Sequence, residues 1–250
     1  VYNMQEMFYN CSNLTALDLT SFDTSSVTTM AYMFKDCSSL TTLDVSSFDT
    51  SSVTSMREMF RNCSGLTTLD VSSFNTSNTS DLGLMFYSCL SLTSLDLSNF
   101  DTLNVTTMQS MIEFCSSLTS LDLSSFDTSS VTNVFRMFFG CSSLTNLNIK
   151  HFDVSSVTNA TSFLQNANNA LTTAAYDELL EAWAAQDVQP NVAWHFGDAQ
   201  YTVETIADWY SPRINSSLSI INNKLVSIAD NTNTFGAAQQ IDNLIVGNAY

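Results

Sequence analysis

The sequence is poor in the residues and motifs on which catalytic sites depend. It contains only 2 histidines, and it has no glycine-rich phosphate loop, no metal-ligand spacing and no nucleophile-elbow motif. Both histidines fit structural positions, a corner of the chain for His151 and the apolar W-H-F run for His195. The sequence therefore predicts a protein that is not an enzyme, with no catalytic, cofactor-binding or metal-binding residues.

Basic residues are also scarce. Lys and Arg number 7 against 24 Asp and Glu, which gives a net charge of −17. A chain of this charge is repelled by a nucleic-acid backbone and by an anionic membrane surface. No apolar run approaches the roughly 20 residues that span a bilayer. We therefore expect neither nucleic-acid binding nor membrane insertion within this chain.

What the sequence does have is a strict internal repeat, marked by its cysteines. They recur every 26 residues, at Cys11, Cys37, Cys63, Cys89, Cys115 and Cys141. Aligning the repeats on cysteine gives unbroken columns of leucine (from Leu14 and Leu17), phenylalanine (from Phe22) and methionine (from Met7). A period this regular predicts a solenoid in which like residues stack on like.

Within a repeat, the spacing of apolar residues changes. Leu43 and Val45 alternate with polar neighbours in the run 40–45, which predicts a short strand. The run 53–63 has apolar residues at steps of three and four, which predicts a short helix or helical turn, and the preceding D-T-S-S cluster can cap it. The predicted fold class is an α/β repeat solenoid with one parallel strand and one helix or helical turn per repeat.

The repeat unit CSSLTSLDLSSFDTSSVT, preceded by M-F-x-x, resembles the 26-residue repeat of BspA-like bacterial surface proteins over residues 1 to about 166. This resemblance implies a right-handed, leucine-rich-repeat-like coil. It also implies secretion or surface display, and a role in adhesion or partner binding.

Three regions are predicted. Residues 1–166 form the solenoid, with a partial first coil and six cysteine-marked coils, and a further coil or capping segment is expected before Val1. Residues 167–211 form a C-terminal cap with a helix that carries Tyr176, Leu179, Leu180 and Trp183, followed by a strand in V-Q-P-N-V-A-W-H-F. Residues 212–250 hold the β-type runs S-L-S-I-I, K-L-V-S-I and Q-Q-I-D-N-L-I-V. They resemble the start of a jelly-roll carbohydrate-binding module, and we expect a truncated domain here.

The cysteine ladder has two interpretations. Neighbouring cysteines would lie close enough for a disulfide, but parallel Cβ vectors leave their sulfur atoms poorly aimed. We therefore predict buried free thiols that pack as small hydrophobic side chains, with disulfides as the alternative.

An aspartate column within the predicted strand is the main candidate binding feature. It comprises Asp18, Asp44, Asp70, Asp96 and Asp122, and it ends at Asn148. Repulsion between like charges would favour raised pKa values or bound calcium, and a partner could also bind this stripe. The alternative is that each carboxylate hydrogen-bonds to a neighbouring Ser or Thr. A second acidic column, from Asp23 to Asp153, is predicted to hold turns.

Hydroxyl groups flank the aspartate column, at Thr42, Thr68, Ser94 and Ser120. Such a face could bind a glycan or a protein surface, or it could serve solubility alone. The predicted function is a secreted or surface-displayed adhesion protein that presents this repeated polar concave face to a host extracellular protein or glycan. The alternative is a passive stalk for a downstream carbohydrate-binding or receptor-binding domain, on a bacterial surface or a phage particle. The sequence does not predict an oligomeric state.

Overall fold

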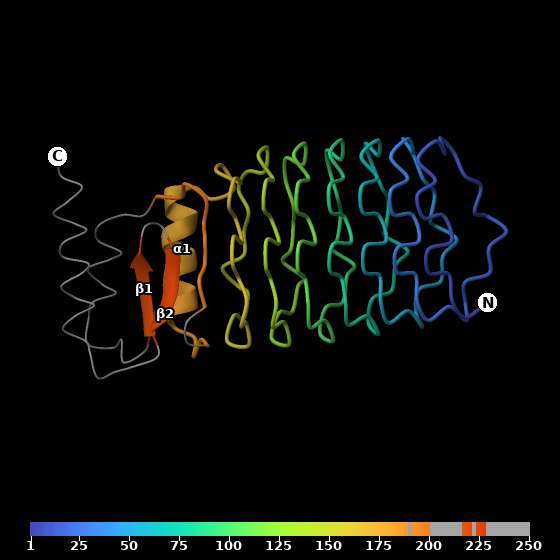
Figure 1. Ribbon diagram of the computed structural model, residues 1–250. Helices are drawn as coiled ribbons and strands as arrows, with labels where there is room; N and C mark the ends of the chain where they lie inside the picture. The colour runs from blue at the N-terminus through green and yellow to red at the C-terminus, as the bar shows by residue number, and fades with distance from the viewer. Residues whose placement is uncertain (190–191, 201–216, 222–223, 229–250) are drawn as a thin grey trace.

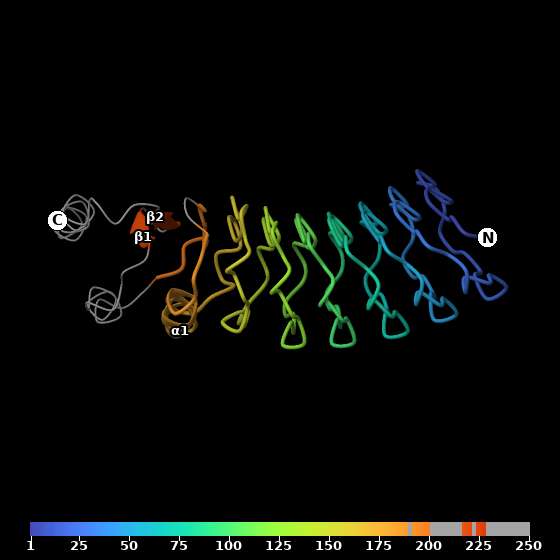
Figure 2. The same cartoon turned by 90° about the horizontal axis from the view of Figure 1, so that it is seen from below.

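The computed structural model describes residues 1–189 and 192–200, together with the backbone of two strands at 217–221 and 224–228. Successive segments of 26 residues, here called coils, lie side by side in chain order from the N-terminus to helix α1 (Figure 1). Each coil is a flattened loop (Figure 2). Isolated parallel bridges join equivalent positions of neighbouring coils, from Asn3↔Thr29 to Asn133↔Asn159. Residues 1–166 therefore form a regular stack.

Backbone hydrogen bonds in the run before each cysteine alternate between two kinds. The amides of Tyr32 and Phe34 donate to carbonyl groups of the next coil, on Arg57 and Met59, both at 2.9 Å. The amide between them bonds within the coil, from Met33 to the Met30 carbonyl at 3.2 Å, and so does the amide of Lys35, to the Tyr32 carbonyl at 3.1 Å. Every second amide is thus used for stacking, and the others close tight turns.

This alternation corrects the helix predicted in each repeat. Residues 1–172 contain no α-helix, and the run 53–63 is a series of turns. Glu58 and Asn62 have φ values of 56° and 59°, which a right-handed helix does not allow. The spacing of three and four between apolar residues, which suggested a helix, arises from these turns. Each turn also brings a side chain back to the core.

The strand predicted for each repeat is absent as well. In the run 40–45 no strand is assigned, and the isolated bridges lie elsewhere, at positions such as Thr29 and Ser55. Only one backbone bond per coil joins equivalent runs, as from Thr93 to the Thr67 carbonyl at 3.2 Å. A single bond fixes the spacing of neighbouring coils but makes no ladder, so this face stays irregular although Leu43 and Val45 are buried.

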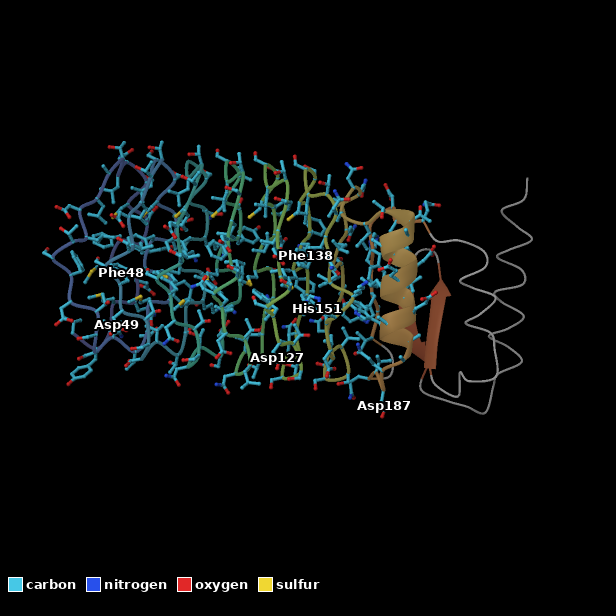
Figure 3. All side chains as sticks on the ribbon, turned by 180° about the vertical axis from the view of Figure 1, so that it is seen from behind. Phe48, Asp49, Asp127, Phe138, His151 and Asp187 are labelled. Atoms are coloured by element: carbon cyan, nitrogen blue, oxygen red, sulfur yellow. The ribbon has the colours of Figure 1, made fainter. Side chains whose placement is uncertain are left out.

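The core lies inside the coils and consists of like residues in contact. Phe34 stacks on Phe60 with ring centroids 5.6 Å apart and an angle of 3° between the rings, and Phe60 stacks on Phe86 at 5.8 Å. Figure 3 shows Phe48 and Phe138 within the stack and Asp127 towards one edge. The apolar columns found in the sequence are therefore the core of the stack.

The cysteines are free thiols, of which Cys11 is half-buried and the other five are buried. Each buried thiol donates to a backbone carbonyl of the preceding coil, as Cys63 does to Phe34 at 3.1 Å. Burial raises the pKa of Cys37 to about 11 and that of Cys115 to about 12. The cysteine ladder is therefore part of the packing, and its five buried thiols stay protonated.

A cap covers the last coil. Its helix α1 (Thr173–Ala184) begins at the N-cap Thr172, and Tyr176, Leu179, Leu180 and Trp183 are buried, which confirms the predicted helix. Trp183 and Trp194 pack 4.7 Å apart, and Trp194 meets Phe163 of the stack at 5.1 Å. In the predicted strand V-Q-P-N-V-A-W-H-F, residues 190–191 are outside the described residues, and Ala193 forms an isolated bridge.

Two of the three predicted β-type runs are strands. Strands β1 (Ser217–Ile221) and β2 (Lys224–Ile228) pair antiparallel, with Ser217 opposite Ile228. The third run, at 239–246, and most of the expected truncated domain lie outside the described residues. In the described part of the chain, no helix has both the length and the apolar character that crossing a membrane requires.

Candidate binding surfaces

The carboxylates of the aspartate column hold turns of their own chain. Asp18 accepts hydrogen bonds from the backbone N–H and the hydroxyl group of Thr20, at 3.0 and 2.7 Å, and Asp44 accepts from the N–H of Ser46 at 2.9 Å. The same contact recurs from Ser72, Ser98 and Ser124 to Asp70, Asp96 and Asp122, each at 2.9 Å. All five aspartates are exposed. The structure thus has the hydrogen-bonded arrangement that the sequence left as the alternative.

These hydrogen bonds decide the charge state of the column. Side-chain and backbone bonds from Ser46 lower the pKa of Asp44, and they outweigh the opposing effect of Asp70 and Asp18. The pKa is lowered at every member of the column. The expectation of raised pKa values is therefore wrong, because repulsion between exposed charges is screened by water while the hydrogen bonds are local.

The calcium hypothesis finds no cluster to support it. Within the described residues, no three His, Cys, Asp or Glu side chains lie close enough together to hold a metal ion. Calcium takes six to eight oxygen ligands in proteins, which a line of single carboxylates does not supply.

The flanking hydroxyl groups, unlike the carboxylates, take no part in hydrogen bonds of the described chain. The side chains of Thr42, Thr68, Ser94 and Ser120 are exposed, and their hydroxyls make no hydrogen bond within the described part of the chain. In the second acidic column, by contrast, Asp49 accepts from the N–H and hydroxyl of Ser51 at 2.9 and 2.6 Å, as predicted for a turn. Among these polar columns, the flanking hydroxyls are the side-chain groups that hold no turn of their own chain.

A second surface lies along the turns that precede the cysteines, and the sequence analysis missed it. We call it the aromatic–cationic band. It comprises Tyr9, Tyr32, Lys35, Arg57, Glu58, Arg61, Tyr87, Glu113, Phe114, Phe135, Arg136 and Phe139. Unlike the aspartate column, its positions change from coil to coil: the position of Arg61 is Lys35 one coil earlier and Tyr87 one coil later.

Buried carboxylates anchor the cations of the band. Glu58 binds the Nζ of Lys35 and an Nη atom of Arg61, both at 2.8 Å, and the Nε of Arg57 lies 3.6 Å away. Burial acts to raise the pKa of Glu58, but the hydrogen bonds from Lys35 and Arg61 prevail and keep it below its ordinary value. Glu113 is buried too, and Arg136 lies 3.5 Å from it.

Aromatic rings join these ion pairs into a continuous row. Arg61 lies over Tyr87 at 4.8 Å, and Tyr87 meets Phe114 edge to face at 5.8 Å. Phe114 meets Phe139 in the same way at 5.2 Å, and Arg136 covers Phe139 at 4.7 Å. Edge-to-face and cation–π contacts of this kind hold side chains in place. The band is therefore an ordered surface.

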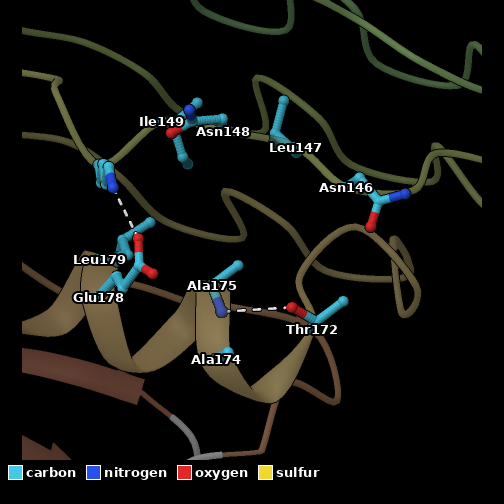
Figure 4. A pocket seen from close by; sticks show the side chains of 10 residues that line it. Asn146, Leu147, Asn148, Ile149, Thr172, Ala174, Ala175, Glu178 and Leu179 are labelled. Carbon is cyan, nitrogen blue, oxygen red and sulfur yellow. Dashed lines mark hydrogen bonds and ion pairs between the residues drawn. The ribbon is translucent and has the colours of Figure 1, made fainter.

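A cleft of about 290 Å³ lies where α1 meets the last coil (Figure 4). Asn146, Asn148, Thr172 and Glu178 are among the residues that line it. The Nζ of Lys150 binds Glu178 at 2.6 Å, and both side chains are half exposed. The cleft offers amide, hydroxyl and charged groups.

The two histidines lie in structural positions. His151 is hydrogen-bonded through Nε2 to the Leu123 carbonyl oxygen at 3.0 Å and packs edge to face on Phe152. The Nδ1 of His195 accepts the N–H of Gly197 at 3.0 Å, and its carbonyl accepts the amide of Leu164. They lie in different regions, one in the last coils and one in the cap.

Comparisons with known proteins give one family. Comparison with curated proteins and with solved structures found no match. One family model matches twice, over residues 1–95 and 66–178, and its description is "Mycoplasma protein of unknown function, DUF285". The two matches together span the stack and the first part of the cap, which is more than half of the chain, and the chain therefore belongs to the DUF285 family.

Proposed function

We propose that this chain is a non-enzymatic binding protein of the BspA-like surface-repeat type, and that its stack is a leucine-rich-repeat-like solenoid. Display outside the cell, on a bacterial surface or a phage particle, belongs to the same proposal. The family match supports the repeat character. The proposed partner is a host extracellular protein or a glycan.

The observation that carries this proposal is the row of unused hydroxyl groups. Thr42, Thr68, Ser94 and Ser120 present the same chemistry coil after coil, and no group of the described chain competes for them. The adjacent aspartates use Oδ1 in their own turns, as Asp44 does, so Oδ2 faces solvent. Each of these four coils thus offers one hydroxyl and one carboxylate oxygen to a polar ligand.

Binding through such a face is weak at each coil. Small polar groups lack the aromatic and arginine anchors of tight interfaces. A ligand with its own repeat, such as a polysaccharide, gains affinity when several coils bind at once. The polar face therefore suits a multivalent partner.

The test uses the intact chain on a panel of glycans and extracellular matrix proteins. In the face variant, Thr42 and Thr68 become valine and Ser94 and Ser120 become alanine. In the matched control, Ser26, Ser52 and Ser130 become alanine, since these serines are exposed on another edge. We expect the intact chain and the control to bind the same ligand and the face variant to lose it. Equal binding by both variants would rule out this face.

A stalk is the second candidate. It is favoured by the turns of the aspartate column, because each carboxylate uses Oδ1 to hold its own chain. Such a column has a structural role whether or not a ligand binds. The absence of any ligand in the panel test, with a chain that melts cooperatively, would support the stalk.

A further inference from the structure

We propose that the aromatic–cationic band is a second interaction surface, and that it takes a polypeptide segment in which carboxylate side chains lie next to apolar ones. The inference goes beyond the proposed function because it uses none of the aspartate or hydroxyl columns. It rests on the composition, the charge geometry and the coil-to-coil variation of the band.

Three carboxylates pair with the arginines of the band, and of these only Asp81, 3.7 Å from Arg57, is appreciably exposed, at 27%. The carboxylates of Glu58 and Glu113 are nearly inaccessible, at 8% and 3% side-chain exposure. The side chains of Arg61 and Arg136 are more exposed, at 29% and 41%, and within each guanidinium group the Nε atom is buried. Of the lysines and arginines in residues 1–200, all except Lys150 belong to the band. In a chain of charge −17, this is the surface that complements a carboxylate.

The geometry of the rings favours a polypeptide over a sugar. Stacking on a sugar needs a free ring face, but Arg61 already covers Tyr87, and Arg136 covers Phe135 and Phe139. The guanidinium groups that lie over these rings carry N–H donors, and ring edges carry partial positive charge. Carboxylates and backbone carbonyls are the natural partners of such groups. Tyr, Phe and Arg are also the residues enriched in the centres of protein–protein interfaces.

The band has a direction. Its N-terminal half holds three cations, Lys35, Arg57 and Arg61, whereas its C-terminal half holds one, Arg136, among phenylalanine rings. A segment whose acidic residues are concentrated towards one end, with apolar residues towards the other, matches this uneven distribution. Because equivalent positions differ from coil to coil, each coil contacts a different part of the segment, which is how a repeat protein reads a sequence.

The test selects peptides from a random library of displayed 12-residue sequences on the intact chain, and it measures the affinity of the enriched peptides. In the band variant, Arg61, Tyr87 and Phe139 each become glutamine, the residue that the chain itself has at the equivalent position Gln165. In the control, Asp49, Asp101 and Asp127 become asparagine, as at the equivalent Asn75. Thermal melting of each variant checks that it folds.

We expect enriched peptides to combine Asp or Glu with apolar residues, to bind the band variant at least tenfold more weakly, and to bind the control within about twofold. Peptides that bind the band variant as well as the intact chain would overturn the inference. So would peptides enriched in Lys and Arg, or self-association of the intact chain that the band variant abolishes, because a second copy would then occupy the band.

A failure of the band is distinguishable from a failure of the proposed function. If a glycan or matrix protein binds and only the hydroxyl-face variant loses it, while no peptide is enriched, the proposed function survives and the band inference fails. If neither the panel nor the library yields a ligand, both fail.

Discussion

Thr50 and Asn75, 25 residues apart in the chain, hold each other through two hydrogen bonds. The Thr50 hydroxyl donates to the Asn75 carbonyl oxygen at 2.9 Å and accepts the Asn75 backbone N–H at 2.7 Å. The same exchange links Thr24 to Asp49, and hydroxyls at Thr76, Thr102 and Thr128 donate in the same way. A buried threonine thus joins each coil to the next.

Replacing this threonine tests how much its hydrogen bonds between coils contribute to stability. Thr50→Val keeps the shape of the side chain but leaves the Asn75 amide and carbonyl without their partner. We expect the free energy of unfolding to fall by about 1–3 kcal/mol, measured by urea denaturation. Thr42→Val is the control, because that hydroxyl is exposed and unbonded, and its effect should stay within about 0.5 kcal/mol. Equal losses of unfolding free energy in the two variants would show that the Thr50 hydrogen bonds do not contribute to stability.

Removing a buried charge should cost more than removing an exposed one. Glu58→Gln leaves Lys35 and Arg61 without their anion, and we expect a loss of about 1–3 kcal/mol in the free energy of unfolding. Glu178→Gln breaks the exposed pair with Lys150 and should cost less than about 1 kcal/mol. If the two losses are equal, Glu58 does not anchor the band.

The thiols should divide into two classes. A water-soluble thiol reagent at pH 8 should modify Cys11 quickly in the native protein, because that side chain is only half-buried. The other five should react only after unfolding, since burial raises the pKa of groups such as Cys37 and Cys115 and keeps them from the reagent. Rapid modification of all six would contradict the packed ladder. Mass spectrometry after proteolysis identifies the modified residues.

Acid should destabilise the stack. Hydrogen bonds lower the pKa of Asp18, Asp44, Asp70 and their counterparts below the ordinary 3.8, so the unfolded chain binds protons at a higher pH than the folded chain. Their contribution to stability is present above pH 3.8 and is lost as the pH falls through the lower folded-state values. We expect the urea midpoint to drop between pH 5 and pH 2.

A variant of the aspartate column tests whether these carboxylates cause the loss of stability in acid. Replacing Asp44, Asp70 and Asp96 by asparagine keeps an oxygen acceptor, as Asn75 does for Ser77, but removes the titrating group. The drop in the midpoint should therefore become smaller in this variant. An unchanged pH dependence would assign acid unfolding to other groups.

The sequence predicted the stacking columns and the cap helix because both follow from burial alone. Phe34 lies above Phe60 since like residues recur at one period, and Trp183 is buried because it lies on the apolar face of α1. For each coil the sequence predicted a short helix or a helical turn, and the structure has a row of turns without a helix, because apolar steps of three and four also fit such a row. Asn10, Asp36 and Asn62, all with positive φ, were the available signal, since these residue types tolerate that conformation.

The band was missed for a different reason. Positions that keep the same residue in most repeats identify the core and the aspartate column. The position shared by Lys35, Arg61 and Tyr87 carries the opposite signal, because it varies from repeat to repeat while the cysteine two residues later does not. Their contacts could not be predicted, since the cation–π geometry depends on turns that bring Arg61 over the ring of the next coil.

The alternating use of backbone amides has a mechanical consequence. Since every second amide before a cysteine binds the following coil, a pull along the chain must break one set of such bonds before it reaches the next. Each rupture would release about 26 residues, which extend by roughly 90 Å when stretched. A chain stretched from its two ends should therefore lengthen in steps of similar size, one coil at a time.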